Sequence, residues 1–138
     1  MEDSTLHKVR ISVLWLFSEV AFMGIMVLTF LKPGIIEQII SGEIEGSKIG
    51  QELLVFYAFF VLFPLVMAFL SVTLKDSINR WANMVMGTVA VVLSFVGLSE
   101  QIADPYAYAV LIWIAKIVVD ALIVWYAYKW PKKSAFGG

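Results

Sequence analysis

The chain contains no cysteine, a single histidine and few charged residues. Without cysteine there is no disulfide framework, no thiolate nucleophile and no sulfur-coordinated metal site. Charged residues make up 15% of the sequence, against about 25% in a typical soluble domain. Hydrophobic residues make up 61%, against about 45–50% in a soluble domain. This composition is typical of an integral membrane protein.

Motifs for catalysis and cofactor binding are also missing. The sequence has no glycine-rich phosphate loop and no Ser–His–Asp set. The sole histidine, His7, precedes the first apolar segment, so we expect it to be solvated. The basic residues are too few, and too closely tied to the membrane boundaries, to form a nucleic-acid surface. We therefore expect no enzyme activity, no cofactor, no metal site and no nucleic-acid partner.

Four apolar segments are each long enough to cross a hydrocarbon core of ~30 Å, which takes about 20 helical residues. The predicted spans of this single domain (1–138) are residues 10–32, 51–75, 80–100 and 105–130. These runs are too long for strands and do not alternate apolar with polar residues. Pro64, near the centre of the second span, predicts a kink because proline removes a backbone donor. The sequence thus predicts an all-α fold, a four-helix antiparallel membrane bundle.

Basic residues are divided unevenly between the two sides of this predicted bundle. One side carries seven of them: Lys8, Arg10, Lys75, Arg80, Lys129, Lys132 and Lys133. The other side carries two, Lys32 and Lys48, with six acids: Glu37, Glu43, Glu45, Glu52, Glu100 and Asp104. Because cytoplasmic loops are enriched in Lys and Arg, we expect both termini in the cytoplasm. The expected location is the cell (plasma) membrane, with the lipid bilayer as partner.

The only long connection runs from Gly34 to Gln51. Its first residues include four isoleucines at helical spacing: Ile35, Ile36, Ile39 and Ile40. We predict a short interfacial helix on the outer surface that ends near Gly42. The alternative is a disordered acidic loop.

Three ionisable residues fall inside the predicted spans. Lys116 and Asp120 lie four residues apart, which places them on one face of a helix. Glu19 and Asp120 are each about nine residues from the inner ends of their spans, so they should have similar depth. If these spans pack together, the three residues form a cluster of formal charge −1. Because a buried net charge is costly, we expect a protonated carboxylate, or a bound cation or water.

This cluster has three interpretations. In the first, Lys116–Asp120 is a pair within the bundle, and protonated Glu19 bonds to a neighbour such as Ser18. In the second, Glu19, Lys116 and Asp120 bind a substrate or ion, because ionisable residues inside membranes are functional candidates by default. In the third, they form a contact between copies of the chain.

The third span carries small and polar residues at intervals of three and four, which share one stripe: Asn83, Gly87, Ala90, Ser94, Gly97 and Gln101. Small residues allow helices in lipid to approach closely. The stripe therefore packs against the other spans, or it forms a homo-oligomer seam through Gly87, Ala90, Ser94 and Gly97.

Four short motifs carry a resemblance to a known family: VLWLF (13–17), KPG (32–34), NRWAN (79–83) and WYAYKWP (125–131). With the spacing of the spans, they resemble a family of unknown function, of small prokaryotic four-helix integral membrane proteins. The resemblance covers nearly the whole chain. It implies the architecture and a cell-membrane location, and an acid in the first and fourth spans, which maps onto Glu19 and Asp120. It implies no activity.

The leading functional hypothesis is a small proton- or ion-coupled transporter or permease that acts as a homo-oligomer. Glu19 and Asp120 would titrate or bind a cation, and Lys116 would be the counter-charge. Residues 18–20 (SEV) are also similar to the first helix of small multidrug-resistance transporters, which favours transport slightly. The competing hypothesis is a structural or accessory membrane protein, in which the cluster only fixes helix packing and assembly.

Overall fold

The computed structural model describes residues 2–103 and 105–131. It contains four long helices: α1 (Glu2–Thr29), α3 (Gln51–Thr73), α4 (Asp76–Ser99) and α5 (Ala107–Tyr128). Each is long and apolar enough to cross a membrane, by length and composition. The helices pack together, which confirms the predicted all-α architecture of four long apolar helices. Asp104, Lys132 and Lys133, which the charge count includes, lie outside the described residues.

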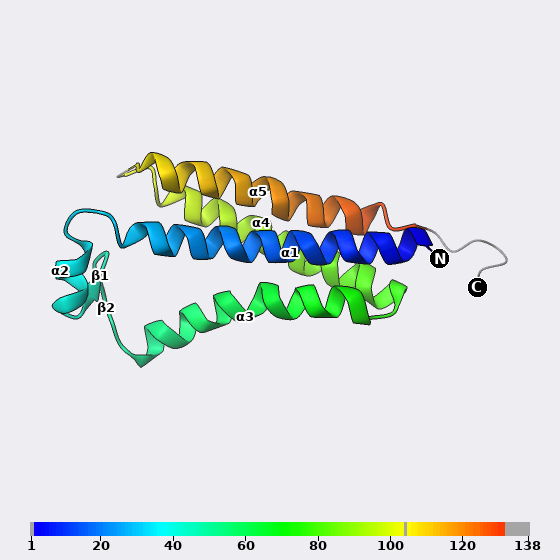
Figure 1. Cartoon of the computed structure of the whole chain (residues 1–138), viewed down its shortest axis with the longest axis horizontal. Helices are drawn as coiled ribbons and strands as arrows, with labels where there is room; N and C mark the ends of the chain where they lie inside the picture. Colours follow the sequence, from blue (N-terminus) through cyan, green and yellow to red (C-terminus); the bar gives the residue numbers. More distant parts are fainter. Residues whose placement is uncertain (1, 104, 132–138) are drawn as a thin grey trace.

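Successive long helices run in opposite directions, so the start of α1 and the end of α5 lie at the same end of the molecule (Figure 1). We call this the basal end. The opposite end carries a short helix, α2 (Ile35–Ile40), and two strands, β1 (Glu43–Ile44) and β2 (Ser47–Lys48). We call it the hairpin end.

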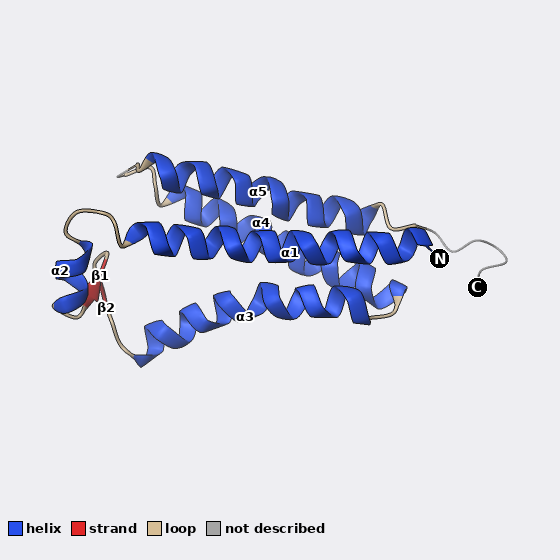
Figure 2. Ribbon diagram, viewed as in Figure 1, coloured by secondary structure: helices blue, strands red, loops and turns tan. Residues whose placement is uncertain are grey.

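The short helix α2 occurs where the isoleucine spacing predicts one, and Ile35 is its buried residue. The strands that follow were not predicted. They pair antiparallel, with Glu43 opposite Lys48 (Figure 2). The chain can reverse there because Gly42 and Gly46 adopt φ values of +92° and +83°, a region that glycine enters without steric cost.

The prediction for His7 is wrong. Helix α1 begins at Glu2, so it includes His7, and the end of α5 covers this turn of the helix. The imidazole is buried between two aromatic rings, at centroid distances of 5.2 Å from Tyr126 and 5.3 Å from Trp130. A ring nitrogen also forms a hydrogen bond with the backbone carbonyl of Tyr126. His7 therefore ties α1 to α5 at the basal end.

Helix α3 is the least embedded of the four. It packs mainly on α1 and meets α4 only slightly. Its buried residues are Pro64, Met67, Ala68 and Ser71, all in its second half. Figure 1 shows its first half diverging from α1 toward the hairpin end. Since Pro64 lies inside the helix and cannot donate a backbone hydrogen bond, it accounts for a change of direction at this point.

The small-residue stripe of α4 lies inside the chain. Gly87, Ala90, Ser94 and Gly97 are all buried. A Cβ atom on Gly87 would come within 2.9 Å of the Val124 side chain, and one on Gly97 within 2.4 Å of the Trp113 indole. The two glycines thus let α5 approach α4 closely. This corrects the predicted homo-oligomer seam, because α5 already covers these residues; an oligomer would need a different face.

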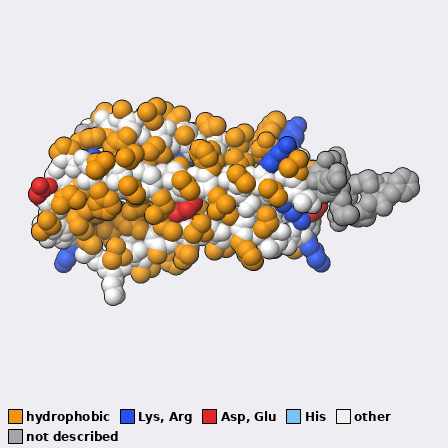
Figure 3. Space-filling model, viewed as in Figure 1, with side chains coloured by type: hydrophobic (Ala, Val, Ile, Leu, Met, Phe, Trp, Pro, Cys, Tyr) orange, Lys and Arg blue, Asp and Glu red, His pale blue; other side chains and the backbone are white. Residues whose placement is uncertain are grey.

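The outer surface of the four long helices is largely apolar. Large hydrophobic side chains are exposed on every one of them, among them Val20, Phe59, Trp81 and Leu111. Figure 3 shows hydrophobic side chains over most of one face and basic side chains mainly toward the basal end. Such a surface fits contact with the hydrocarbon of a bilayer.

Candidate functional site

The site is built around Asp120, whose side chain is fully buried among three helices. Its Oδ1 accepts a hydrogen bond from Ser18 of α1, at 2.6 Å. Its Oδ2 accepts one from Ser94 of α4, at 2.6 Å, and one from Lys116 of α5, at 3.0 Å. Lys116 Nζ also donates to Ser94 Oγ at 3.0 Å. Asp120 and Lys116 are therefore paired and hydrogen-bonded, which offsets the cost of burying both charges.

Glu19 follows Ser18 on α1 and has a different environment. A one-residue step turns a helix by about 100°, so Ser18 and Glu19 point to different neighbours. The Glu19 side chain is buried, yet neither of its carboxylate oxygens has a hydrogen-bond partner among the described residues. A buried carboxylate without partners is unusual, because burial without a hydrogen bond costs several kcal/mol, on the order of 2–7 for a polar group.

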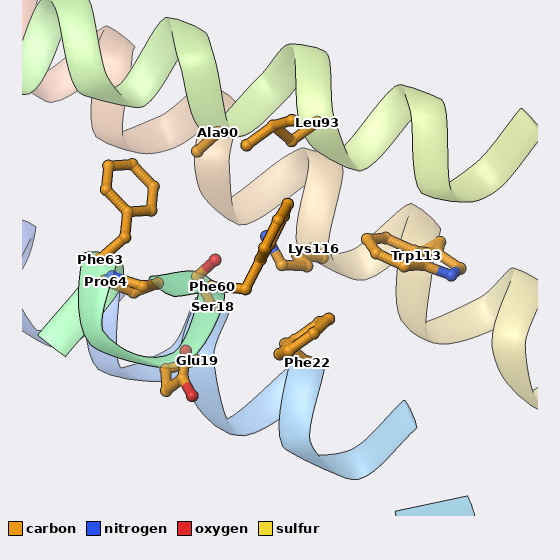
Figure 4. Close-up of a pocket in the computed structure, with 10 residues that line it drawn as sticks. All are labelled: Ser18, Glu19, Phe22, Phe60, Phe63, Pro64, Ala90, Leu93, Trp113 and Lys116. Atoms are coloured by element: carbon orange, nitrogen blue, oxygen red, sulfur yellow. The ribbon is translucent and has the colours of Figure 1, made fainter. Parts of the chain in front are cut away.

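Glu19 lines a cavity of about 30 Å³, which we call the inner cavity. All four long helices contribute to it (Figure 4), through Ser18, Glu19, Phe22, Phe60, Phe63, Pro64, Ala90, Leu93, Trp113 and Lys116. A water molecule needs roughly 10–15 Å³ measured in this way, so the inner cavity has room for water beside Glu19.

The structure therefore divides the predicted three-member cluster. It brings Lys116 and Asp120 into direct contact and leaves Glu19 without a bond to either. Glu19 and Lys116 share the inner cavity and interact electrostatically. Ser18, which one interpretation assigns to Glu19, donates to Asp120 instead.

A second cavity, of about 160 Å³, lies toward the hairpin end, and we call it the outer cavity. Its polar lining residues are Thr29, Lys32, Glu45, Tyr57, Glu100, Gln101 and Tyr108. Phe22 and Trp113 line both cavities, so these two rings stand between them. Their centroids are 6.4 Å apart in an edge-to-face arrangement. The Lys116 ammonium lies 6.0 Å from the Trp113 ring, on the side of the inner cavity.

A family model matches residues 2–136, which is nearly the whole chain. The chain belongs to the DUF6326 family. This is a family of unknown function, and its match confirms the resemblance carried by the four motifs. Together with its four long apolar helices, membership makes this DUF6326 protein a small multi-pass membrane protein. No curated protein and no solved structure matches the chain significantly.

The DUF6326 chain has a second buried polar network, toward the basal end, that the sequence reasoning missed. Trp15 Nε1 donates to Asn83 Oδ1 at 2.7 Å, and Ser71 Oγ donates to the same oxygen at 3.1 Å. Asn83 Nδ2 donates to Asn79 Oδ1 at 2.6 Å. All four side chains are fully buried and join α1, α3 and α4. The signal was present in the NRWAN motif, which places two asparagines one helical turn apart.

The ionisable side chains of this site differ in how far their hydrogen-bonding capacity is used. Among residues 2–103 and 105–131, no group of three or more His, Asp or Glu side chains could hold a metal ion. Asp120 has its donors, and Lys116 is bound to it. Glu19 alone has free acceptor atoms, and a cavity beside them.

Proposed function

We propose that this protein is a small proton-coupled transporter or permease of the cell membrane, and that Glu19 binds and releases the proton. The observation that carries the proposal is the buried carboxylate of Glu19, which has no hydrogen-bond partner among residues 2–103 and 105–131 and belongs to a residue that lines a cavity with room for water. The role of Asp120 differs from the one first assigned to it. Asp120 holds Lys116 in place, and Lys116 interacts electrostatically with Glu19 in the cavity that the two residues share.

The inner cavity favours a proton over a larger substrate. Its volume of about 30 Å³ accommodates water but not an organic molecule. The side chains that α3 and α4 present to Glu19 carry no charge: Phe60, Phe63, Pro64, Ala90 and Leu93. Protonation of Glu19 therefore depends on Lys116 and on water that enters the cavity.

Proton flux tests this role directly. In proteoliposomes loaded with the pH dye pyranine, a potassium diffusion potential is expected to drive proton uptake above that of protein-free vesicles. Glu19→Gln is expected to abolish the protein-dependent part, because an amide cannot exchange a proton at neutral pH. Glu52→Gln serves as the matched control, since Glu52 is an exposed acid outside both cavities. A Glu19→Gln flux equal to the wild type, or no protein-dependent flux in the wild type, would refute the proposal.

The proposal places both termini in the cytoplasm and the hairpin end outside, because basic residues concentrate at the basal end. Because the chain has no cysteine, a maleimide can react only with a cysteine that is introduced, and this tests the orientation. Ser47, at the hairpin end, and Ser77, at the basal end, are both exposed. A membrane-impermeant maleimide added to intact cells should label Ser47→Cys and leave Ser77→Cys unlabelled. The reverse pattern would invert the proposed topology.

A second function is favoured by the complete pairing of Asp120. A structural or accessory membrane protein needs a buried polar network only to fix helix packing, and Asp120 joins α1, α4 and α5 in that way. This function leaves the free carboxylate of Glu19 without a role. The proteoliposome experiment separates the two functions, because an accessory protein shows no flux that depends on Glu19.

A further inference from the structure

We infer that the outer cavity is a binding site for a small organic cation, such as an alkylammonium ion. The inference rests on the proposed function, since it supplies the substrate class for a proton-coupled transporter. Binding itself can be measured without transport. The outer cavity is about five times larger than the inner one, at about 160 Å³ against about 30 Å³. It therefore has room for a ligand of several heavy atoms.

The charges around the outer cavity favour a cation. Three charged side chains line it: Lys32, Glu45 and Glu100. Lys32 Nζ bonds to Glu45 Oε1 at 3.0 Å and lies 4.3 Å from the centre of the Tyr106 ring. Burial lowers the pKa of Lys32, but the hydrogen bond and charge of Glu45 outweigh this effect and hold the pKa above its usual value. Lys32 is thus charged and already neutralised by Glu45.

Once Lys32 and Glu45 are paired, Glu100 is the remaining charged side chain that lines the outer cavity. Its side chain forms no hydrogen bond or ion pair within the described part of the chain. One lysine and two glutamates give the outer cavity a formal charge of −1. Both glutamates interact electrostatically with Tyr57, which lines the same cavity. A cation bound beside Tyr57 would be attracted mainly by Glu100, because the charge of Glu45 is already paired with Lys32.

The walls of the outer cavity favour an organic cation over a metal ion. Aromatic rings enter from three long helices and the turn after α1: Phe22, Phe30, Tyr57, Tyr108 and Trp113. Such rings attract alkylammonium ions through their negative faces, and together they can surround the methyl groups. A hydrogen bond of 3.0 Å between the Thr29 and Tyr108 hydroxyls fixes one of the rings. A hard metal ion would need several oxygen ligands at short distance, and most of this wall is carbon.

Trp113 connects this site to the proton site. Its indole packs directly on the backbone of Gly97, where even a Cβ atom would come within 2.4 Å. The ring is therefore held in position between the two cavities. A cation that contacts its outer face lies one ring away from the Glu19 cavity. Its positive charge would favour release of the Glu19 proton, which is the coupling that exchange of a cation for a proton requires.

Binding can be measured by titration calorimetry on the purified full chain in detergent micelles. The probes are tetramethylammonium, choline and benzyltrimethylammonium, with 3,3-dimethylbutan-1-ol as the uncharged analogue of choline. We expect at least one of the cations to bind and the alcohol not to bind. Glu100→Gln should weaken cation binding about tenfold, because it removes the one unpaired charge of the site. Glu52→Gln, an exposed acid outside the cavity, should leave binding within about twofold of the wild type.

The inference is overturned if none of the three cations binds, or if the alcohol binds as tightly as choline. It is also overturned if Glu100→Gln binds normally, or if Glu52→Gln weakens binding as much as Glu100→Gln does. Absence of binding together with Glu19-dependent proton flux refutes this inference alone. Cation binding without any Glu19-dependent flux refutes the proposed proton role and leaves the site in place.

Discussion

Asp120→Leu is expected to destabilise the folded protein by about 3–5 kcal/mol, the cost of leaving one partner of a buried ion pair alone. The substitution strands the Lys116 ammonium inside the bundle and removes the acceptor of two buried hydroxyls, those of Ser18 and Ser94. None of these donors has an alternative carboxylate within hydrogen-bond distance in the described structure. Unfolding of the purified protein by titration with SDS from mild micelles measures the difference.

A double variant separates pairing from packing. Lys116→Met combined with Asp120→Leu removes both charges and keeps similar side-chain volumes, so most of the lost stability should return. Asp76→Asn is the comparison for a partly exposed pair, because the Lys8–Asp76 bridge lies at the basal end and should contribute about 0–1 kcal/mol. If the double variant were as unstable as Asp120→Leu alone, the hydroxyl contacts rather than the charge pairing would hold the helices together.

Trp15→Ala is expected to cost about 3 kcal/mol, near the lower limit for removal of a buried tryptophan. In a membrane the lost stability comes from packing, because lipid is as apolar as the protein interior. The Trp15 ring is fully buried and packs edge-to-face on Phe63 at 5.3 Å. Its loss opens a cavity where α1, α3 and α4 meet and removes a donor from Asn83.

Trp81→Ala is the matched control, because Trp81 is 64% exposed on the outer surface of α4. Its removal should change the free energy of unfolding by less than about 1 kcal/mol. Trp15→Phe isolates the hydrogen bond, which should contribute roughly 0.6–1.7 kcal/mol in a membrane bundle. Equal losses for Trp15→Ala and Trp81→Ala in the same SDS titration would show that the buried network does not stabilise the fold.

The depth of the site residues along their helices could be predicted from the sequence. The neighbouring helix that each side chain faces could not. Counting residues along two helices places Glu19 and Asp120 near the same level, and Ser18, the neighbour of Glu19, does contact Asp120. Which residue faces α5 depends on the rotation of α1 about its axis. That rotation is set by packing on all three neighbours, and a change of about 100° exchanges Ser18 with Glu19. In place of the predicted triad, the structure has a bonded Lys116–Asp120 pair and a separate Glu19 carboxylate.

Prediction from the sequence is limited in the same way for other parts of the fold, where a feature depends on residues distant in the chain. Hydropathy predicts four spans because each must cover a bilayer, and the isoleucine spacing predicts α2. Burial of His7 depends on the end of α5, which is distant in sequence. Two of the side chains that bond to Asn83, Trp15 and Ser71, come from other helices, so the NRWAN motif indicates the Asn79–Asn83 pair but not these partners. The spacing of Gly87 and Gly97 predicts close packing, but not whether the partner is α5 or another copy.

The position of Lys116 and Asp120 on the last helix also affects how the chain inserts into the membrane. An isolated α5 would carry two charges into lipid, each costing ~2.5–3.5 kcal/mol on insertion scales. Two of the three donors to Asp120, Ser94 and Lys116, lie on α4 and α5 themselves, which are adjacent in sequence and pack along their length. These two helices can therefore enter the membrane as a pair, in which the Ser94 hydroxyl of α4 already bonds to both members of the Lys116–Asp120 ion pair of α5. Contact with Ser18 completes the site when α1 joins them.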